Sequence, residues 1–123
     1  MTNILTLPLV QILATVGSDE DWIDAISFAD ASGAPLDLTG IAITLDISNG
    51  GTTPMLTAST ANGLLSLVEG TGGATVDNVL LIAIPAAIKT ALTAGVYPIS
   101  GIASGDGHLI DIITGSLTIR QSF

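Results

Sequence analysis

Acidic side chains are the residues of this chain best suited to chemistry, and their densest group is Asp19-Glu20-Asp21 with Asp24 nearby. Several carboxylate oxygens in one loop are the ligands that calcium prefers. This group has neither EF-hand spacing nor an intervening glycine, and a run of charges is typically a solvated face. We therefore expect a structural turn here, with no metal and no other cofactor.

Two catalytic interpretations of the carboxylates are also weak. Paired carboxylates cleave glycosides when they flank a substrate cleft, but eleven acids in 123 residues will form close pairs by chance. Aromatic platforms for sugars are limited to Trp22, Phe28, Tyr97 and Phe123. The segment Asp37-Leu-Thr-Gly40 differs from the Asp-Thr-Gly of aspartic proteases by its inserted leucine, and no second copy supplies the other carboxylate.

The remaining reactive groups are few. His108 has no serine or cysteine partner in a recognisable motif, so we expect a solvated histidine beside a turn rather than a general base. With no cysteine, the chain has no thiol nucleophile, no disulfide and no Cys/His zinc site. Asp37 and Thr39 are expected to form a turn through bonds to nearby backbone. The sequence therefore predicts no catalytic residue and no enzyme activity.

The net charge and the hydropathy of the chain restrict the classes of molecule that it can bind. Lys89 and Arg120 face eleven acids, for a formal charge of −9. Nucleic acid is an unsuitable partner, because phosphate binding requires Lys and Arg. Charged residues make up 11% of the chain, against roughly 25% in a typical domain, and the mean hydropathy is +0.72. We expect apolar surface to be covered by other copies or other proteins.

No membrane span or signal peptide is expected. The richest apolar window, Val79 to Ile88, is broken by Pro85 and ended by Lys89, and it is shorter than the 18 residues of a candidate span. The N-terminus lacks the basic start and small-residue cleavage site of a secretory signal.

Alternating hydrophobicity predicts the elements that position these groups. Ile41, Ile43, Leu45 and Ile47 alternate with smaller or polar residues, the period of a strand with one buried face. Together with similar runs this gives about nine strands in one domain: 9–15, 22–28, 41–47, 55–59, 64–68, 79–84, 96–103, 109–113 and 116–120. Pro85 to Leu92 is expected to form a short helical turn. We predict an all-β antiparallel sandwich.

The expected core joins both sheets. Its members occupy the period-two positions of these runs: Ile41, Ile43, Leu45, Ile47, Leu65, Leu67, Leu80, Ile82, Ile84, Leu117 and Ile119. Trp22 and Tyr97 are expected to be buried, with their polar atoms bonded to backbone. Turns are predicted at Asp30 to Gly33 and at Ser104 to Gly107, where glycine supplies positive φ.

The order of these motifs resembles immunoglobulin-like β-sandwich domains of tailed-phage virion proteins, including the N-terminal domains of baseplate and tail-fibre proteins. The matching pieces are listed here in chain order: Trp22, Asp30-Ala-Ser-Gly-Ala-Pro35, Asp37-Leu-Thr-Gly40, Ile41 to Ile47, Pro85 to Leu92, Gly95-Val-Tyr97, Asp106-Gly107 and Gly115-Ser-Leu-Thr-Ile119. They extend over almost the whole chain. The resemblance implies a sandwich of about seven to nine strands with one short helical turn.

The same resemblance implies a non-enzymatic bacteriophage structural protein, located in the virion after assembly in the host cytoplasm. An adaptor or a tail, neck or baseplate component is the first expectation; a capsid decoration protein, or a secreted or surface module that binds carbohydrate or protein, is the alternative. Expected partners are copies of the chain and other virion proteins. We divide the chain into an N-terminal arm, 1–8, and a sandwich domain, 9–123. Apolar residues at the ends are the interface candidates, because termini order only when something ties them down: Ile4, Leu5, Leu7 and Phe123.

Overall fold

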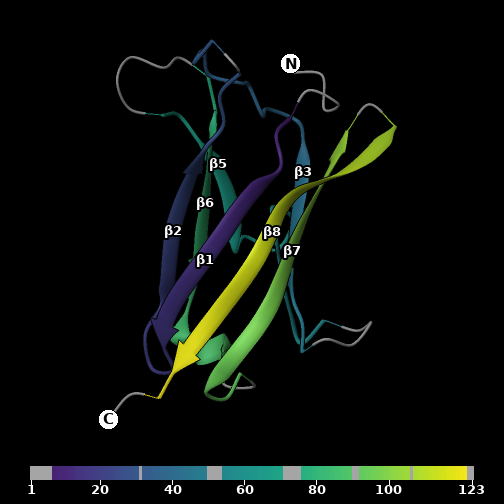
Figure 1. Cartoon of the computed structure of the whole chain (residues 1–123). Helices are drawn as coiled ribbons and strands as arrows, with labels where there is room; N and C mark the ends of the chain where they lie inside the picture. Colours follow the sequence, from purple (N-terminus) through teal and green to yellow (C-terminus); the bar gives the residue numbers. More distant parts are fainter. Residues whose placement is uncertain are drawn as a thin grey trace.

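A computed structural model of the chain describes residues 7–30, 32–49, 54–70, 76–89, 92–105 and 107–121. These residues form two sheets that face each other (Figure 1). The eight strands are β1 (Val10–Gly17), β2 (Trp22–Ser27), β3 (Ala42–Ile47), β4 (Leu56–Ser59), β5 (Leu65–Val68), β6 (Val79–Ile84), β7 (Gly95–Gly105) and β8 (His108–Arg120). A 3₁₀ turn, η2 (Ala86–Ile88), follows β6. The predicted all-β sandwich with one short helical turn is confirmed.

The strand order is that of the immunoglobulin fold. One sheet has the order β1-β8-β7-β3-β4 and the other β2-β6-β5. Immunoglobulin sheets group strands B, E and D against G, F and C, with C′ beside C. Here β2, β6 and β5 take the places of B, E and D, while β8, β7, β3 and β4 take those of G, F, C and C′.

One pairing differs from the antiparallel prediction. β1 runs parallel to β8 over its whole length, from Val10 opposite Ile113 to Gly17 opposite Arg120. The turn from Gly17 to Trp22 then carries the chain into the other sheet, so β1 and β2 do not form a hairpin. Hydrophobic spacing contains no information on strand direction, which explains why the sequence did not reveal this.

The last two expected strands form one. The runs 109–113 and 116–120 are parts of β8, which pairs with β7 from the hairpin turn to Ile119. The register shifts at Gly101/Ile102, and the extra residue lets both Ile112 and Ile113 be buried. A β-bulge of this kind bends a strand without ending it. The alternation of β8 is therefore interrupted while its pairing continues.

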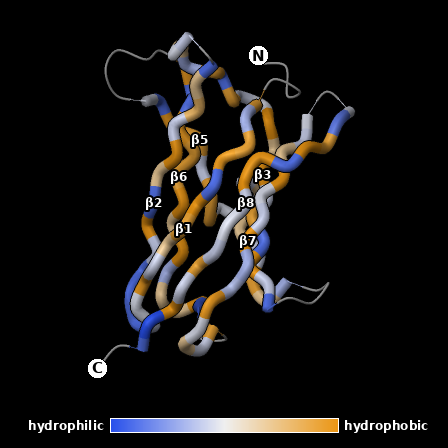
Figure 2. The backbone as a smooth tube through the Cα atoms, viewed as in Figure 1, coloured by the Kyte–Doolittle hydropathy of each residue, from blue (hydrophilic) through white to orange (hydrophobic). Residues whose placement is uncertain are grey.

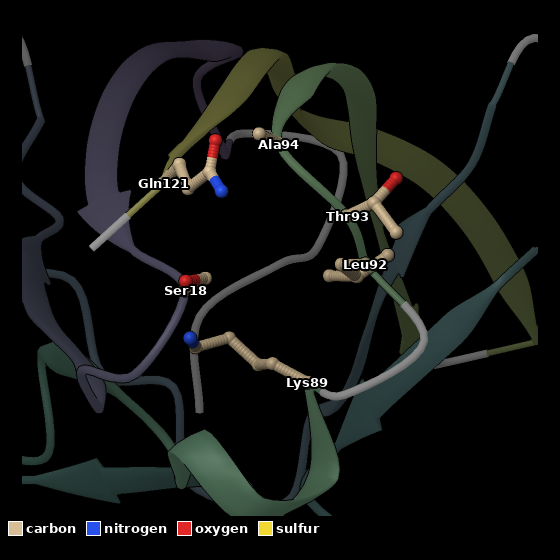
Figure 3. A pocket seen from close by; sticks show the side chains of 6 residues that line it. All are labelled: Ser18, Lys89, Leu92, Thr93, Ala94 and Gln121. Carbon is tan, nitrogen blue, oxygen red and sulfur yellow. The ribbon is translucent and has the colours of Figure 1, made fainter. Parts of the chain in front are cut away.

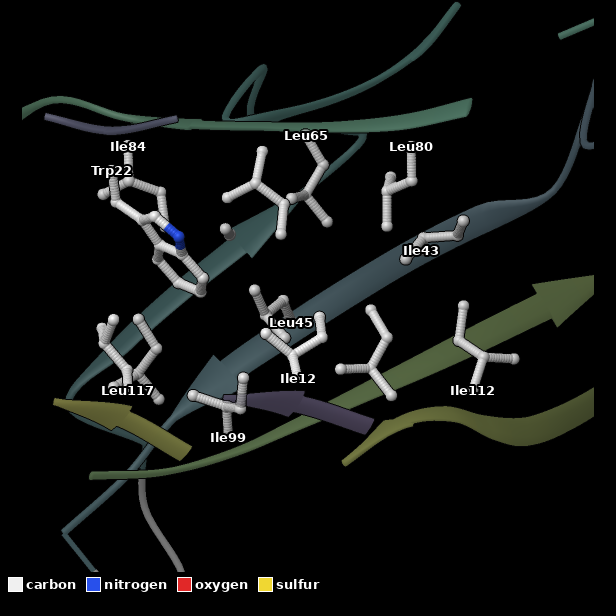
Figure 4. Packing of buried hydrophobic residues seen from close by; sticks show 14 of the residues in the cluster. Ile12, Trp22, Ile43, Leu45, Leu65, Leu80, Ile84, Ile99, Ile112 and Leu117 are labelled. Atoms are coloured by element: carbon white, nitrogen blue, oxygen red, sulfur yellow. The ribbon is translucent and has the colours of Figure 1, made fainter. Parts of the chain in front are cut away.

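The core lies between the two sheets, where aliphatic side chains of both meet (Figure 4). All predicted core residues are buried except Leu67, which is half-buried at its margin. The prediction missed Phe28 and Leu38, both fully buried in the connection between β2 and β3. Backbone bonds tie this connection to the loop before β6, from Phe28 N to Asn78 O at 2.9 Å and from Leu38 N to Asp77 O at 2.9 Å.

Trp22 and Tyr97 are both buried, as predicted, but only one satisfies its polar atom. The Tyr97 hydroxyl donates to Thr93 O at 2.7 Å. The indole Nε1 of Trp22 has no hydrogen-bond partner among the described residues. That part of the prediction is wrong, because Trp22 points inward from β2 among aliphatic side chains such as Ile84, where no acceptor is within reach (Figure 4).

The predicted turns are present where the structure describes them. Asp30 Oδ1 accepts from Ser32 N, Ser32 Oγ and Ala34 N, and Gly33 has φ +88°. In the β7–β8 hairpin Gly105 pairs with His108 and Gly107 has φ +76°, while Asp106 lies outside the described residues. Pro85 precedes η2, and backbone bonds continue to Leu92 N.

Candidate functional site: the surfaces of the sandwich

Both cations of the chain lie at one end of the sandwich, around the turn that follows β1. Lys89 is buried, and its Nζ donates to Gly17 O at 3.2 Å. Arg120 Nη2 contacts Glu20 Oε1 at 3.3 Å, and Glu20 also accepts from Gly17 N. The Arg120–Glu20 pair is more than half exposed on both sides, so it contributes little stability.

Of the acidic group in the sequence, Asp19, Glu20 and Asp21 lie in this turn, and Asp24 follows in β2. Asp21 Oδ1 accepts from Ala86 N at 2.8 Å and thereby fixes η2 to the turn. Asp24 Oδ1 accepts from the neighbouring Ala25 N. In the portion of the chain that the structure describes, no three His, Asp or Glu side chains are placed to share a metal ion.

A pocket of about 470 Å³ opens beside Lys89 (Figure 3). Ser18, Leu92, Thr93, Ala94 and Gln121 form the rest of its lining. These side chains supply one amine, two hydroxyls and one amide, without a carboxylate or an imidazole. The lining therefore lacks the paired acid and base that general acid–base catalysis requires.

His108, the single imidazole of the chain, lies elsewhere. It is exposed at the base of the β7–β8 hairpin turn, as predicted. Asp37 is also a structural residue: its Oδ1 accepts from Thr39 Oγ1 at 2.6 Å and Thr39 N at 3.0 Å. The Thr39 hydroxyl and then the Thr39 N–H hold the pKa of Asp37 below its usual value. Both interpretations as turn residues are confirmed.

The outer face of the five-stranded sheet is rich in hydroxyl groups. We call it the hydroxyl face; its positions follow from the pairing register and are Gln11, Leu13, Thr15, Ala42, Thr44, Asp46, Thr57, Ser59, Val96, Pro98, Ser100, Ile102, Ser104, Leu109, Asp111, Thr114, Ser116 and Thr118. Arg120, opposite Gly17, continues the same outward series at the end of β8 and is the one cation among these described positions. Asp46 accepts from Thr57 Oγ1 at 2.9 Å, whereas Leu13, Val96 and Leu109 are each more than two-thirds exposed.

The outer face of the three-stranded sheet is aliphatic. This aliphatic face consists of Ile23, Ala25, Ser27, Ser66, Val68, Val79, Leu81 and Ala83. None of these residues is charged, and Ile23 is 62% exposed. Figure 2 shows that hydrophobic residues continue along β6. Such a surface is typical of contact with another molecule.

The structure tests little of the predicted terminal interface. Ile4, Leu5 and Phe123 lie outside the described residues. Leu7 is 8% exposed and belongs to the core of its own chain. Sequence reasoning missed both outer faces, although the alternation that predicted the core also specifies the residues on the opposite side of each strand.

The comparisons with known proteins add little. No family model matches the chain, and no curated protein matches it. Among solved structures, the chain is similar to a DUF4784 family protein from Bacteroides caccae, with a TM-score of 0.40 and 12% sequence identity. That alignment covers 95% of this chain and 23% of the other, so the chain spans less than a quarter of that protein. A similarity at this level carries no argument about function. Among the described residues no helix is long and apolar enough to cross a membrane.

Proposed function

We propose that this chain is a non-enzymatic structural protein of a bacteriophage virion. In this proposal it is an adaptor or a tail, neck or baseplate component that binds copies of itself and other virion proteins. It is assembled into the particle in the host cytoplasm. The motif order from Trp22 to Ile119 is the basis for the virion assignment.

The single observation that supports an assembly role is the composition of the two outer faces. Across the described strands the aliphatic face has no charged residue and the hydroxyl face has one cation, Arg120 at the end of β8, while exposed aliphatic side chains occur on both. Soluble single domains typically have mixed charges of both signs on their surfaces. A subunit whose aliphatic face is covered by a neighbour does not need charges on that face.

Catalysis receives no support from the described residues. The pocket beside Lys89 has no acid–base pair, and the acids near it bond to backbone or to Arg120. Buried Trp22 and Tyr97 supply no exposed aromatic platform for a sugar. These observations favour an assembly component over the alternative of a carbohydrate-binding module.

The test is to locate the chain in a particle. We expect virions purified from the phage that encodes it to contain the protein in a fixed stoichiometry, with cryo-EM density at symmetric positions of the tail, neck or baseplate. Density on the capsid surface would select the decoration alternative. Absence of the protein from purified particles, together with glycan binding by the isolated domain, would contradict the proposal.

The terminal arm can be tested in the same particles. Because Leu7 is part of the core, a deletion that probes the arm should end at residue 6. We expect removal of residues 1–6 to reduce incorporation into particles while the melting temperature changes little. A deletion variant that incorporates normally would remove Ile4 and Leu5 from the interface.

A further inference from the structure

The four edge strands of the sandwich differ in how they are protected against pairing with another chain. An edge strand presents unpaired N–H and C=O groups, and proteins limit this by short edges, inward-pointing charges, prolines or bulges. β4 and β5 are each four residues long. β2 has Asp24 at an inward register position between Trp22 and Ile26, where its side chain is exposed. Three of the four edges therefore show a protective feature.

β1 shows none of these features. It is eight residues long, contains no charge and no proline, and pairs with β8 without a register shift. Its position at the end of the sheet order leaves its other side without a partner strand among the described elements. Leu13 is 74% exposed on its outward face. β1 is thus the longest edge of the sandwich, and the one without a blocking residue.

We propose that β1 is a docking edge for β1 of a second copy of this chain. The two strands run antiparallel across a two-fold axis and join two five-stranded sheets into one continuous sheet. Strand addition of this kind derives its affinity from backbone hydrogen bonds and needs no charged side chain. A two-fold contact uses the same surface of both subunits, so one exposed edge is sufficient for the pair.

Charge favours a second copy at this edge over stacking of the hydroxyl faces. The chain has a formal charge of −9, so contacts between copies are opposed wherever carboxylates meet. Stacked hydroxyl faces would bring Asp46 and Asp111 of two copies together. β1 contributes no carboxylate. Pairing through β1 joins the two sheets side by side, so Asp46 and Asp111 of one copy do not face those of the other.

The size of the contact sets its expected strength. Eight residues extend about 26 Å along a strand, and strand pairing alone buries less than the roughly 800 Å² per partner of a standard interface. We therefore expect a dimer in exchange with monomer, strengthened when neighbours in an assembly raise the local concentration. The inference refines the proposed function by naming the surface through which copies meet.

The experiment compares two matched double variants of the full chain. Leu13→Lys/Thr15→Lys places lysines on the edge strand, and Val96→Lys/Ser100→Lys places them on the same face of the inner strand β7. All four side chains are exposed, and both variants change the formal charge by the same amount. Circular dichroism and the melting temperature first establish that both are folded.

Sedimentation over a concentration series then separates the outcomes. Like charges across paired strands are destabilising. We therefore expect the edge variant to weaken dimerisation by about tenfold or more and the face variant by less than about threefold. An equal loss in both variants would assign the contact to the hydroxyl face. A wild-type protein that is monomeric up to about 1 mM overturns the inference and leaves the virion role to the particle test.

Hydrogen exchange supplies a readout of the backbone itself. In wild type, protection of amides in β1 should rise with protein concentration, whereas β2 and β4 should not change. The edge variant should lose the concentration dependence. If protection of β1 is independent of concentration but disappears when residues 1–6 are deleted, the chain's own arm occupies the edge, and the proposed occupant is wrong.

Discussion

The two sheets of this sandwich bury the same kind of face and expose different ones. Inward positions of both are mainly aliphatic, as Leu45 in β3 and Leu80 in β6 illustrate, each with no exposed area. Outward, the five-stranded sheet presents mainly serine and threonine, and the three-stranded sheet presents mainly alanine, valine, leucine and isoleucine. The hydroxyl face can remain in water, whereas the aliphatic face is suited to a contact.

The difference separates folding from assembly. Core formation constrains only the inward positions, because these alone leave water when the sheets pack. The core does not constrain the outward positions, so their composition reflects the water or the partner protein that each sheet contacts. On this basis the aliphatic face and the unprotected β1 edge are the surfaces to examine for partners, and the hydroxyl face is the solvent-exposed side.

The largest expected effects test whether the inner faces are equivalent. Leu45→Ala and Leu80→Ala each remove a fully buried side chain from opposite sheets of one core. Each should lower the free energy of unfolding by about 2 to 5 kcal/mol, measured by urea denaturation. A loss below about 0.5 kcal/mol for either one would show that its sheet does not share the common core.

A second prediction concerns the glycine against which β1 packs. Gly115 has φ +144°, and a Cβ placed there would lie 1.8 Å from Ile12 O of β1. Gly115→Ala therefore has to displace β1, and we expect a loss of at least about 2 kcal/mol. Gly63→Ala is the matched control, with φ +82° and no atom within 4 Å of the added Cβ.

The control should lose only about 1 kcal/mol, from backbone strain. Equal losses in the two alanine variants would mean that the close approach of β1 to β8 adds nothing to stability. A larger loss at Gly115 would establish β1 as part of the five-stranded sheet in solution. The three-stranded sheet has no glycine in its described strands, so a larger loss at Gly115 would identify a contribution to stability that only the five-stranded sheet has.

Sequence reasoning predicted the features of this fold that depend on neighbouring residues. Alternation located nearly every strand and core position, and the side chains of Asp30 and Asp37 indicated their turns, because both signals act over a few residues. Burial of Phe28 and Leu38, the parallel direction of β1 and the bond from Lys89 to Gly17 depend on contacts between distant segments. No local pattern contains that information.

The candidate surfaces could be predicted only in part, because they too depend on contacts between distant segments. The composition lacks the charges of an ordinary soluble surface. The apolar residues near the N-terminus pointed to Leu7 as an interface residue, but the structure places Leu7 in the core. Which outward residues share a face depends on register and strand order. The hydroxyl face and the unprotected edge could be recognised only after both were known.

A third prediction sharpens the contrast between the outer faces. Leu81 is half-buried on the central strand of the aliphatic face, and Thr118 is half-buried on the hydroxyl face. Leu81→Thr should lose about 1 kcal/mol through reduced apolar burial, whereas Thr118→Val should remain within about 0.5 kcal/mol of wild type. Similar losses for the two variants in urea unfolding would mean that the faces differ in composition but not in energetic role.

The smallest expected effect lies in the connection between the two sheets. The hydroxyl of Ser32 and then the N–H groups of Ala34 and Ser32 hold the pKa of Asp30 below its usual 3.8, and Thr39 does the same for Asp37. The unfolded chain therefore binds protons more readily than the folded chain in the window just below pH 3.8. The stabilisation from these carboxylates is fully present above that window, and it is lost as the pH falls through the lower folded pKa values.

The double variant Asp30→Asn/Asp37→Asn removes both titrating groups while keeping an acceptor oxygen at each turn. Urea midpoints of wild type and variant, measured from about pH 6 to about pH 2.5, should differ most at the upper end and converge as the pH falls below 3.8. All other carboxylates are common to both proteins, so their titration cancels in the difference. A gap that stays constant over the whole range would show that the two turns hold their aspartates no better than the unfolded chain does. The connection would then be fixed by buried Phe28 and Leu38, and by the packing of the two sheets around them, rather than by its charged turns.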